Sequence, residues 1–478
     1  MEVLILLLLA SLTLVTSQTI VETLPGYPGP LPFKLETGYI GVGEDEAVQL
    51  FYYFVESEGN PLEDPLMVWL SGGPGCTTLH AFFFEIGPMK IMYGKYIDNV
   101  PALRLDPNSW TKTVNVLYVE APTLTGFSYT KTPESVRSSD TVSASQTAEF
   151  VRKFIRDHPK FSNNPLYVTG ISYSGIIIPI VTEELYKGND EGLQPTLNIR
   201  GYVAGNPLTD KNSDINSRFE YSYHMGLISE ELYESARKNC LEEYAQADSN
   251  NLLCMSAIDE VDKRIERIND QRILDVDCDP PGSLVRGGNP IFRGNYQKSH
   301  LTNQIRMLSA RSSFKDTNCD VDIHDYAAAW ANNKDVMKAL GVREGTVKEF
   351  VKCNLDMKYN YGELSMPLYD FNVQSSVVYH QNLTKRNCRA LIFSGDHDLR
   401  VPHSGTLKWI KSLNLTMTDS NWDAWYSNRQ VGGYKTTFAR DNYTLVFATL
   451  KGAGHTASED KPREGSDMIK RWFAHRPI

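Results

Sequence analysis

Three side chains of the types used in nucleophilic catalysis each follow a run that the sequence predicts to be a β-strand. The first is Ser172, which comes after the strand-like run 166–169 and before the apolar run 176–181. This pattern predicts a sharp turn between strand and helix, the nucleophile elbow, which lifts a serine hydroxyl out of the sheet. Such a turn admits only small neighbours, and Gly170, Ser174 and Gly175 are small. Ser172 is therefore the predicted nucleophile.

The other two side chains are an aspartate and a histidine later in the chain. The run 389–393 leads into Ser394-Gly395-Asp396, and the run 445–450 leads into a glycine-rich stretch that ends at His455. The carboxyl ends of parallel strands meet at one edge of a sheet, so we expect Ser172, Asp396 and His455 to meet there. The order Ser, Asp, His along the chain is that of α/β-hydrolases. Asp398 is the alternative acid; Asp396 is preferred because it directly follows Gly395.

The chemistry expected of these groups is acyl transfer through a covalent intermediate. His455 would take the hydroxyl proton as Ser172 attacks an acyl carbon, while Asp396 would hold the imidazole in the required tautomer. The backbone N–H groups of Tyr173 and of Gly73, in the glycine-rich loop 71–76, would stabilise the oxyanion. Loss of one such donor typically costs about 2.7–4 kcal/mol.

The elements that must position these groups alternate along the chain. Strand-like runs at 48–55, 66–70 and 114–119 and a helical pattern at 141–158 precede Ser172, which predicts an α/β protein with a mostly parallel sheet. Residues 209–354 are more charged and helical and hold five of the seven cysteines. They are predicted to be a cap inserted between two parts of the core, 18–208 and 355–478.

Within the predicted cap, residues 282–315 carry six Lys and Arg residues and neither Asp nor Glu. This basic stretch is predicted to be an exposed loop. A sharper hypothesis is a protease-accessible linker whose cleavage leaves two chains joined by disulfides. The protein would then be either a monomer or a two-chain product of internal processing.

Composition and the N-terminus indicate the class of protein and its compartment. A formal charge of −10 and 41% hydrophobic residues indicate a globular protein without the basic face that binds nucleic acid. Residues 1–17 read as a secretory signal peptide, and no later run is apolar enough to span a membrane. Glycosylation sequons begin at Asn382, Asn414 and Asn442. These features predict passage through the secretory pathway to the vacuole or the extracellular space.

No metal or other cofactor is expected. Asp396, His397 and Asp398 alternate sides on an extended segment, and no HExxH motif is present. His403, near the same predicted edge, is expected to be structural or to face the substrate.

Several motifs together resemble the serine carboxypeptidase family, and most closely its plant branch of serine carboxypeptidase-like acyltransferases. They are Leu31-Pro32-Phe33-Lys34-Leu35-Glu36-Thr37-Gly38-Tyr39, Trp69-Leu70-Ser71-Gly72-Gly73-Pro74-Gly75-Cys76, Gly126-Phe127-Ser128-Tyr129, Gly205-Asn206-Pro207, Ser394-Gly395-Asp396-His397-Asp398 and Gly452-Ala453-Gly454-His455-Thr456-Ala457. The resemblance implies the α/β-hydrolase fold with a cap and a triad of Ser172, Asp396 and His455. It also implies the disulfides Cys76–Cys353, Cys240–Cys254 and Cys278–Cys319, with Cys388 unpaired.

Two positions distinguish the peptidases of this family from the transferases. Peptidases grip the substrate carboxylate with an Asn and a Glu, where this chain has Ser71 and Ile171, so Ser71, Gly72 and Ile171 are the expected substrate contacts. The resemblance implies transfer of an acyl group from a 1-O-glucose ester to a hydroxyl acceptor. Many such transferases carry Asp where Ile171 stands, and Pro122-Thr123-Leu124-Thr125 also departs from their pattern. The alternatives are a hydrolase, either carboxypeptidase or esterase, and a non-catalytic partner of an active relative.

Overall fold

The computed structural model describes residues 18–276, 321–354, 357 and 368–478. The predicted signal peptide, the basic loop 282–315 and the proposed Cys278–Cys319 pair lie outside the described residues. No helix in the described ranges is both long enough and apolar enough to cross a bilayer.

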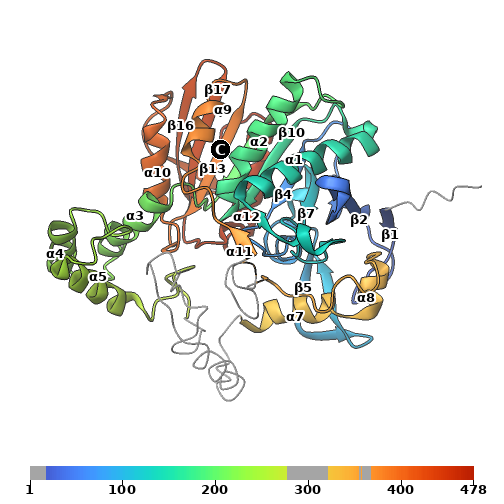
Figure 1. Cartoon of the computed structure of the whole chain (residues 1–478), viewed down its shortest axis with the longest axis horizontal. Coiled ribbons are helices and arrows are strands. Elements are labelled where there is room, and N and C mark those ends of the chain that lie inside the picture. Colours follow the sequence, from blue (N-terminus) through green and yellow to red (C-terminus); the bar gives the residue numbers. More distant parts are fainter. Residues whose placement is uncertain (1–17, 277–320, 355–356, 358–367) are drawn as a thin grey trace, which may run out of the picture.

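A large twisted sheet organises the described part of the chain (Figure 1). Its centre is six parallel strands, and antiparallel strands flank it on both sides. In spatial order the strands are β1 (Gln18–Val21), β2 (Leu35–Val42), β3 (Val48–Val55), β7 (Asn115–Val119), β4 (Leu66–Leu70), β10 (Leu166–Ile171), β11 (Ile199–Gly205), β13 (Arg389–Gly395), β17 (Tyr443–Leu450), β16 (Gln430–Arg440) and β14 (Thr416–Met417). Two further strands join it, β8 (Tyr129–Thr130) beside β3 and β15 (Asp423–Ser427) beside β16.

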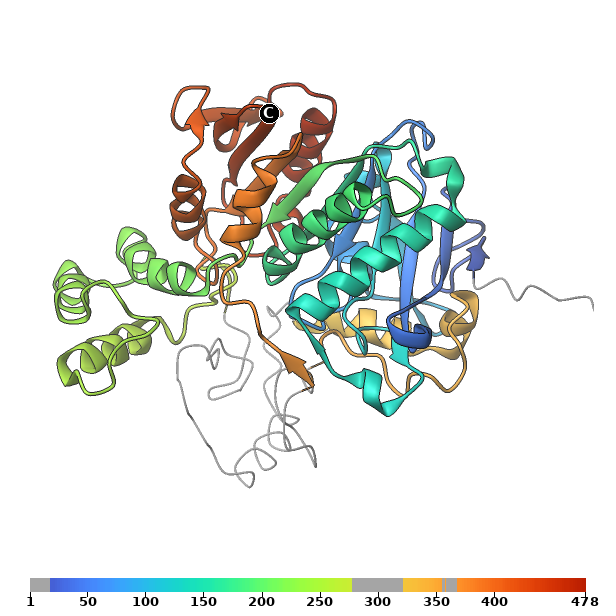
Figure 2. The same ribbon diagram turned by 45° about the horizontal axis from the view of Figure 1, so that its top comes forward.

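The sheet is buried on both faces, as the continuous apolar runs predicted. Along β4, Val68 packs into one apolar cluster, and Met67 and Trp69 pack into the other. The first face is covered by α1 (Asp140–Asp157), α2 (Ser174–Asp190), α9 (Val377–Leu383) and α10 (His403–Ser412). Figure 2 shows α1 and α2 side by side against the sheet. The second face is covered by α11 (Ala457–Asp460), α12 (Pro462–Phe473) and the short helical turn Ala81–Glu85.

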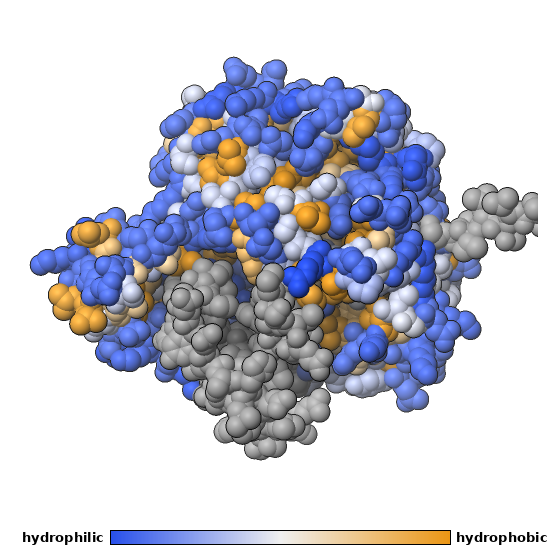
Figure 3. Space-filling view, in the orientation of Figure 1, coloured by the Kyte–Doolittle hydropathy of each residue, from blue (hydrophilic) through white to orange (hydrophobic). Residues whose placement is uncertain are grey.

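Apart from α9, the described helices between β11 and β13 form two groups. The helices α3 (Lys211–His224), α4 (Glu230–Cys240) and α5 (Leu252–Ile265) form an arm with a small apolar core of its own. Figure 3 shows apolar surface at the end of this arm, where Leu241, Leu252 and Leu253 are exposed. By contrast, α7 (Val321–Ala331) and α8 (Lys334–Ala339) bury Trp330 and Val336 in the main core. The boundaries of the cap at 209 and 354 stay a prediction.

Two small sheets complete the described elements. The hairpin of β5 (Met89–Ile97) and β6 (Val100–Leu105) lies beside α7, and β9 (Ser138–Ser139) pairs with β12 (Tyr369–Asp370). The predicted α/β class with a parallel central sheet is confirmed. The strands that precede the three predicted catalytic residues are β10, β13 and β17; β13 and β17 are neighbours in the sheet, and β11 lies between β10 and β13.

Candidate active site

Ser172 lies on the tight turn between β10 and α2, as the sequence predicted. Its φ of 62° is left-handed, a conformation that costs a residue other than glycine about 1–3 kcal/mol. The surrounding backbone holds it there: the Ser172 N–H donates to the carbonyl of Gly205, and the Ser172 carbonyl accepts from the N–H groups of Gly175 and Leu208. This is the strained strand-to-helix geometry that presents a nucleophile.

The small residues around Ser172 are required by close approach of neighbouring segments. A Cβ added at Gly170 would lie 2.1 Å from the carbonyl oxygen of Leu70, and one added at Gly175 would lie 2.5 Å from Cβ of Pro207. Ser174, where many hydrolases have glycine, fits because its hydroxyl turns back and donates to the carbonyl of Ile171 at 2.7 Å.

His455 lies within hydrogen-bond distance of both a nucleophile and an acid. Its Nε2 is 2.8 Å from Oγ of Ser172, and its Nδ1 is 2.8 Å from Oδ2 of Asp398. His455 is 5% exposed and Asp398 is fully buried. A carboxylate accepts from the protonated Nδ1, so Nε2 of the neutral ring is left to accept the serine proton. The arrangement can therefore activate Ser172 for attack on an acyl group.

The prediction that Asp396 is the catalytic acid is wrong. Oδ1 of Asp396 accepts from Nδ1 of His397 at 2.6 Å and from the N–H of Gly452 at 2.6 Å, whereas Nδ1 of His455 pairs with Asp398. The chain turns at residues 396–397 after β13, which leaves the Asp396 side chain 28% exposed and carries Asp398 inward. Distance from Gly395 along the chain does not set which way a side chain points in such a turn, so Asp398 takes the place predicted for Asp396.

Asn206 and two backbone N–H groups complete the surroundings of Asp398. Nδ2 of Asn206 donates to Oδ2 of Asp398 at 2.8 Å, and the N–H groups of Arg400 and Val401 donate to Oδ1 at 2.8 and 3.0 Å. These donors compensate the loss of water around a buried carboxylate. The Gly205-Asn206-Pro207 motif alone does not predict this role of Asn206. The available signal was its place directly after β11, at the edge where Ser172 was expected.

The predicted oxyanion donors flank the nucleophile. A Cβ added at Gly72 would lie 3.0 Å from Oγ of Ser172, so the glycine loop passes directly over the hydroxyl. Neither the N–H of Gly73 nor that of Tyr173 donates a hydrogen bond to another of the described residues. Both are thus available to an oxyanion, and their role stays a prediction.

A buried carboxyl supports the far side of this loop. Glu120 accepts from Oγ1 of Thr77 at 2.6 Å and from the N–H of Thr78 at 3.0 Å, and burial raises its pKa to about 7. The disulfide Cys76–Cys353 also fixes the loop. The loop that carries Gly73 is therefore held by a covalent bond and by a buried acid.

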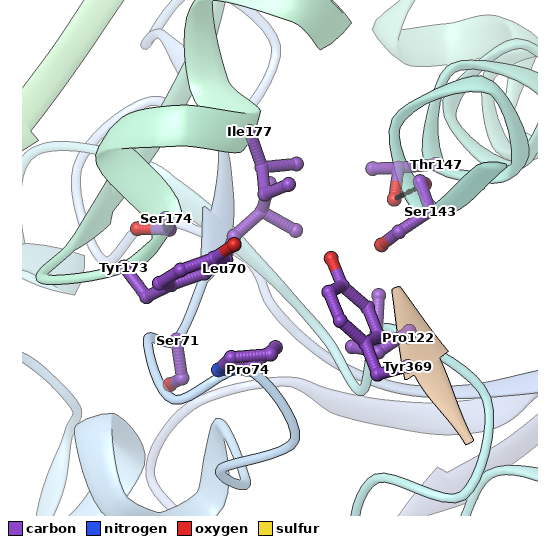
Figure 4. Close-up of a pocket in the computed structure, with 11 residues that line it drawn as sticks. Leu70, Ser71, Pro74, Pro122, Ser143, Thr147, Tyr173, Ser174, Ile177 and Tyr369 are labelled. Carbon is purple, nitrogen blue, oxygen red and sulfur yellow. Dashed lines mark hydrogen bonds between the residues drawn. The ribbon is translucent and has the colours of Figure 1, made fainter. Parts of the chain in front are cut away.

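The predicted substrate contacts Ser71 and Ile171 are both largely enclosed. Ile171 is 8% exposed and packs in the apolar cluster of Trp69 and Phe82. The Oγ of Ser71 is buried and makes no hydrogen bond with the described residues. Figure 4 shows Ser71 at the edge of a small pocket with Tyr173, Ser174 and Tyr369, which has room for about one water molecule.

Two predicted disulfides, Cys76–Cys353 and Cys240–Cys254, are present, and Cys388 is a free, buried thiol. Burial raises the pKa of the Cys388 thiol to about 12, so it is not a reactive nucleophile. Among the sequon asparagines, Asn414 and Asn442 are exposed, while Asn382 is half-buried and donates to Glu183 at 3.0 Å. Glycosylation itself stays a prediction.

A second group of ionisable side chains lies close by in sequence. Nε2 of His80 is 3.5 Å and Nε2 of His324 is 3.3 Å from the carboxylate oxygens of Glu459 on α11, four residues after His455. These distances would suit a metal ion, but Nζ of Lys352 lies 2.6 Å from Nδ1 of His324. An ammonium at Nδ1 places the ring proton on Nε2, the atom that a metal would need. The cluster is better described as a hydrogen-bonded ion network.

This network shifts the ionisation of its members. Burial lowers the pKa of His80 to about 3. Burial alone would raise the pKa of Glu459, but the hydrogen bonds from His324 and His80 hold it well below its usual range. Glu459 is therefore a carboxylate, and it links the helix after His455 to the segment after the Gly73 loop. His403, in contrast, lies at the start of α10 beside Tyr221, and burial lowers the pKa of its imidazole.

Comparisons with known proteins agree with this geometry. The family model of serine carboxypeptidases matches residues 25–475. Serine carboxypeptidase-like 17 of Arabidopsis thaliana is 40% identical over 472 residues, which cover 99% of this chain and 97% of that protein. Serine carboxypeptidase-like 10 of the same plant is 41% identical over 475 residues, which cover 99% and 98%.

A solved structure shows the same fold. It is the crystal structure of Kex1(delta)p, a prohormone-processing carboxypeptidase from Saccharomyces cerevisiae, with a TM-score of 0.71 and 17% identity over 95% of each chain. Its likeness identifies the capped α/β-hydrolase fold. With the family model matched over nearly the whole length and relatives at about 40% identity, the chain belongs to the serine carboxypeptidase family.

Proposed function

We propose that this protein is an acyltransferase that moves an acyl group from a 1-O-glucose ester to an acceptor alcohol through an acyl-Ser172 intermediate. The observation that carries the proposal is the apolar side chain of Ile171 directly before the nucleophile, beside a complete Ser172–His455–Asp398 hydrogen-bond chain.

Ile171 argues against binding a peptide by its C-terminal carboxylate. The side chain has no donor, and it belongs to the same buried apolar cluster as Trp69 and Phe82. A carboxylate brought against it would lose its water without gaining a hydrogen bond, which costs about 1–3 kcal/mol or more for a charged group. Ser71 supplies a single short hydroxyl where family peptidases are expected to have an amide. A neutral ester carries no such penalty.

The chemistry follows from the proton positions. Nε2 of His455 takes the proton of Ser172 Oγ as that oxygen attacks the ester carbon, and the tetrahedral oxyanion forms at Gly73 and Tyr173. The imidazolium, stabilised by Asp398, then protonates the leaving sugar oxygen. In the second half-reaction His455 removes a proton from the acceptor hydroxyl, whose oxygen attacks the acyl carbon. The bond from that carbon to Oγ of Ser172 then breaks, and Oγ takes the proton back from Nε2 of His455. An acceptor held in place outcompetes water because its effective concentration is high.

The compartment proposed for this reaction is the secretory pathway, with the vacuole or the extracellular space as the destination. It is supported by the leader-like residues 1–17 and by exposed sequon asparagines at 414 and 442.

The test is a screen of purified full-length protein with a panel of glucose esters and candidate acceptor alcohols, read by mass spectrometry. The expected result is an acyl–acceptor product with one donor class, absent from a Ser172→Ala control. Release of free acid at the same rate with and without acceptor would show a hydrolase instead. Efficient cleavage of blocked dipeptides without acyl transfer would show a carboxypeptidase and overturn the proposal. Failure of an organophosphonate to label Ser172 would indicate a non-catalytic partner.

A double variant and a matched control test whether Ser71 and Ile171 exclude peptidase activity. The double variant Ser71→Asn/Ile171→Glu provides the two groups expected in family peptidases. It should gain measurable hydrolysis of blocked dipeptides and lose acyl transfer, whereas Ile177→Val, on the same pocket wall, should keep the wild-type pattern.

A further inference from the structure

The segment of residues 270–275, which we call the clamp, follows α5 at the base of the arm and contacts the loop that carries the catalytic base. The carbonyl oxygen of Gln271 accepts the backbone N–H of His455 at 2.5 Å. The neighbouring Gly454 has no room for a side chain, because an added Cβ would lie 2.2 Å from this same carbonyl oxygen and 2.6 Å from Cβ of Arg272. The clamp thus packs directly on the backbone of His455.

The same segment also binds the loop that carries the catalytic acid. The carbonyl oxygen of Asp270 accepts from the N–H groups of Leu399 and Arg400 at 3.0 and 2.8 Å, and the N–H of Ile273 donates to the carbonyl of His397 at 3.1 Å. His397, Leu399 and Arg400, which make these bonds, flank Asp398 on both sides. The N–H of Arg400 is shared, because it also donates to Oδ1 of Asp398 at 2.8 Å. The backbone around the acid is therefore held to the clamp.

Partly buried charges fix the clamp in place. Nη2 of Arg400 lies 2.7 Å from Oδ1 of Asp270, and Nε of Arg400 lies 3.2 Å from both oxygens. Nη2 of Arg218 on α3 lies 3.7 Å from Oδ2 of the same carboxylate. Burial acts to raise the pKa of Asp270, but the charges of Arg400 and Arg218 hold it below its usual range. Asp270 is thus a carboxylate shared between the arm and the acid loop.

A second ion pair ties the clamp to the residues beyond the base. Nη1 of Arg272 lies 3.0 Å from Oδ1 of Asp460, and Oδ2 of Asp460 accepts the N–H of Gly454 at 2.6 Å. His455 is therefore restrained through its own N–H and through that of the preceding residue.

We propose that Asp270 and the clamp position the catalytic acid against the catalytic base. The strands β13 and β17 place the two loops side by side, but a shared sheet edge does not set the distance between side chains. The clamp binds both backbones at once and keeps Oδ2 of Asp398 at 2.8 Å from Nδ1 of His455. Asp270 is a positioning residue, since it touches neither nucleophile nor substrate. The inference concerns activation of Ser172 and holds for any acyl donor.

The test uses full-length protein carrying Asp270→Asn and measures the rate of Ser172 labelling by an organophosphonate across pH. Because small misplacements of catalytic groups cost up to about a hundredfold, we expect labelling to slow at least about tenfold. The acid-side midpoint of the rate profile should move to lower pH, because an imidazolium without a close carboxylate loses its proton more readily. Asp270→Glu, which keeps the charge, should recover part of the rate and the midpoint.

Two further variants separate positioning from folding. Glu266→Gln is the matched control, since Glu266 is an exposed carboxylate at the end of α5, outside the clamp; its labelling should equal wild type. Gly454→Ala places a Cβ against the Gln271 carbonyl and so displaces the clamp from His455 without changing any charge. It should reproduce the slower labelling rate and the lower pH midpoint of Asp270→Asn. A smaller labelled fraction with an unchanged rate constant and midpoint in Asp270→Asn would mean that Asp270 serves only folding. Wild-type labelling in Gly454→Ala would likewise overturn the proposal.

Discussion

Asn206 joins the acid loop to the base loop through a single amide group. Its Nδ2 donates to Oδ2 of Asp398 at 2.8 Å and to the carbonyl oxygen of Gly454 at 3.1 Å. Asn206 is itself fully buried at the end of β11. Replacement by alanine would leave a buried carboxylate with one donor fewer.

We expect Asn206→Ala to reduce kcat/KM by about 10- to 100-fold, since a hydrogen bond to a charged group is worth about 1.5–3 kcal/mol. The measurement is the rate of acyl transfer, or of phosphonate labelling if the donor is unknown. Asn198→Ala is the control. It removes an amide that donates to the carbonyl of Asn163 outside the site, and it should leave kcat/KM unchanged. Equal activities would show that Asn206 is dispensable.

The identity of the acid is tested by two parallel substitutions. Asp398→Asn should lower kcat by about 10⁴-fold, because an amide favours the wrong tautomer of His455. Asp396→Asn should keep activity within about threefold, because an amide oxygen can still accept the N–H of Gly452. Each variant replaces one carboxylate by an amide of nearly the same shape, two positions apart, so steady-state rates compare them directly. The reverse order of effects would restore Asp396 as the acid.

The strained turn at Ser172 predicts a difference in stability between two inactive variants. Ser172→Ala and Ser172→Gly should both lack turnover while remaining folded and glycosylated. Since φ at this position is 62°, glycine relieves a strain that alanine retains. Allowing for the entropy of a glycine in the unfolded chain, Ser172→Gly should be the more stable by about 0.5–1 kcal/mol. Thermal unfolding at one pH measures the difference; an alanine variant as stable as the glycine variant would argue against strain.

Glu85 predicts a pH dependence of stability. Burial raises the pKa of this carboxyl to about 8, far above its value in an unfolded chain. A carboxyl whose pKa is raised in the folded state stabilises the folded protein most below its unfolded pKa of about 4.5. This contribution to the free energy of unfolding falls as pH rises towards 8. Glu85→Gln mimics the protonated form. It should therefore be more stable than wild type at pH 7.5, by on the order of 2–4 kcal/mol, with the gap closing near pH 4.5.

Chemical denaturation of the two proteins at several pH values measures this gap. Glu63→Gln, at an exposed glutamate, should track wild type throughout. A constant difference between wild type and Glu85→Gln would mean that Glu85 is charged in the folded protein at neutral pH.

The sequence was sufficient for the strands and for the nucleophile because each is a local pattern. The strand predicted at 66–70 matches β4, and the helix predicted at 141–158 matches α1 within one residue. Ser172 and His455 were found because each follows a buried strand at the edge where loops gather. Motif resemblance supplied the pairing of Cys76 with Cys353, which lie 277 residues apart.

The acid could not be found in the same way, because the direction of a side chain in a turn depends on tertiary contacts. Asp396 and Asp398 differ by two positions, and only the turn and the donors from Asn206, Arg400 and Val401 select the second. The clamp escaped sequence reasoning for a related reason. Its contacts are mostly backbone hydrogen bonds. Every residue has a backbone carbonyl, so the residue type at position 271 does not indicate that its carbonyl binds His455.

The disulfide Cys76–Cys353 and the pairing of β11 with β13 have a consequence for a chain cut between residues 282 and 315. Ser172 and the clamp would belong to one polypeptide, and Asp398 and His455 to the other. The shared sheet, through partners such as Tyr202 and Ala390, would still join the two fragments after the disulfide is reduced. A nicked molecule would therefore separate into two bands only when it is both reduced and denatured. Its active site would be formed by residues from two polypeptide fragments.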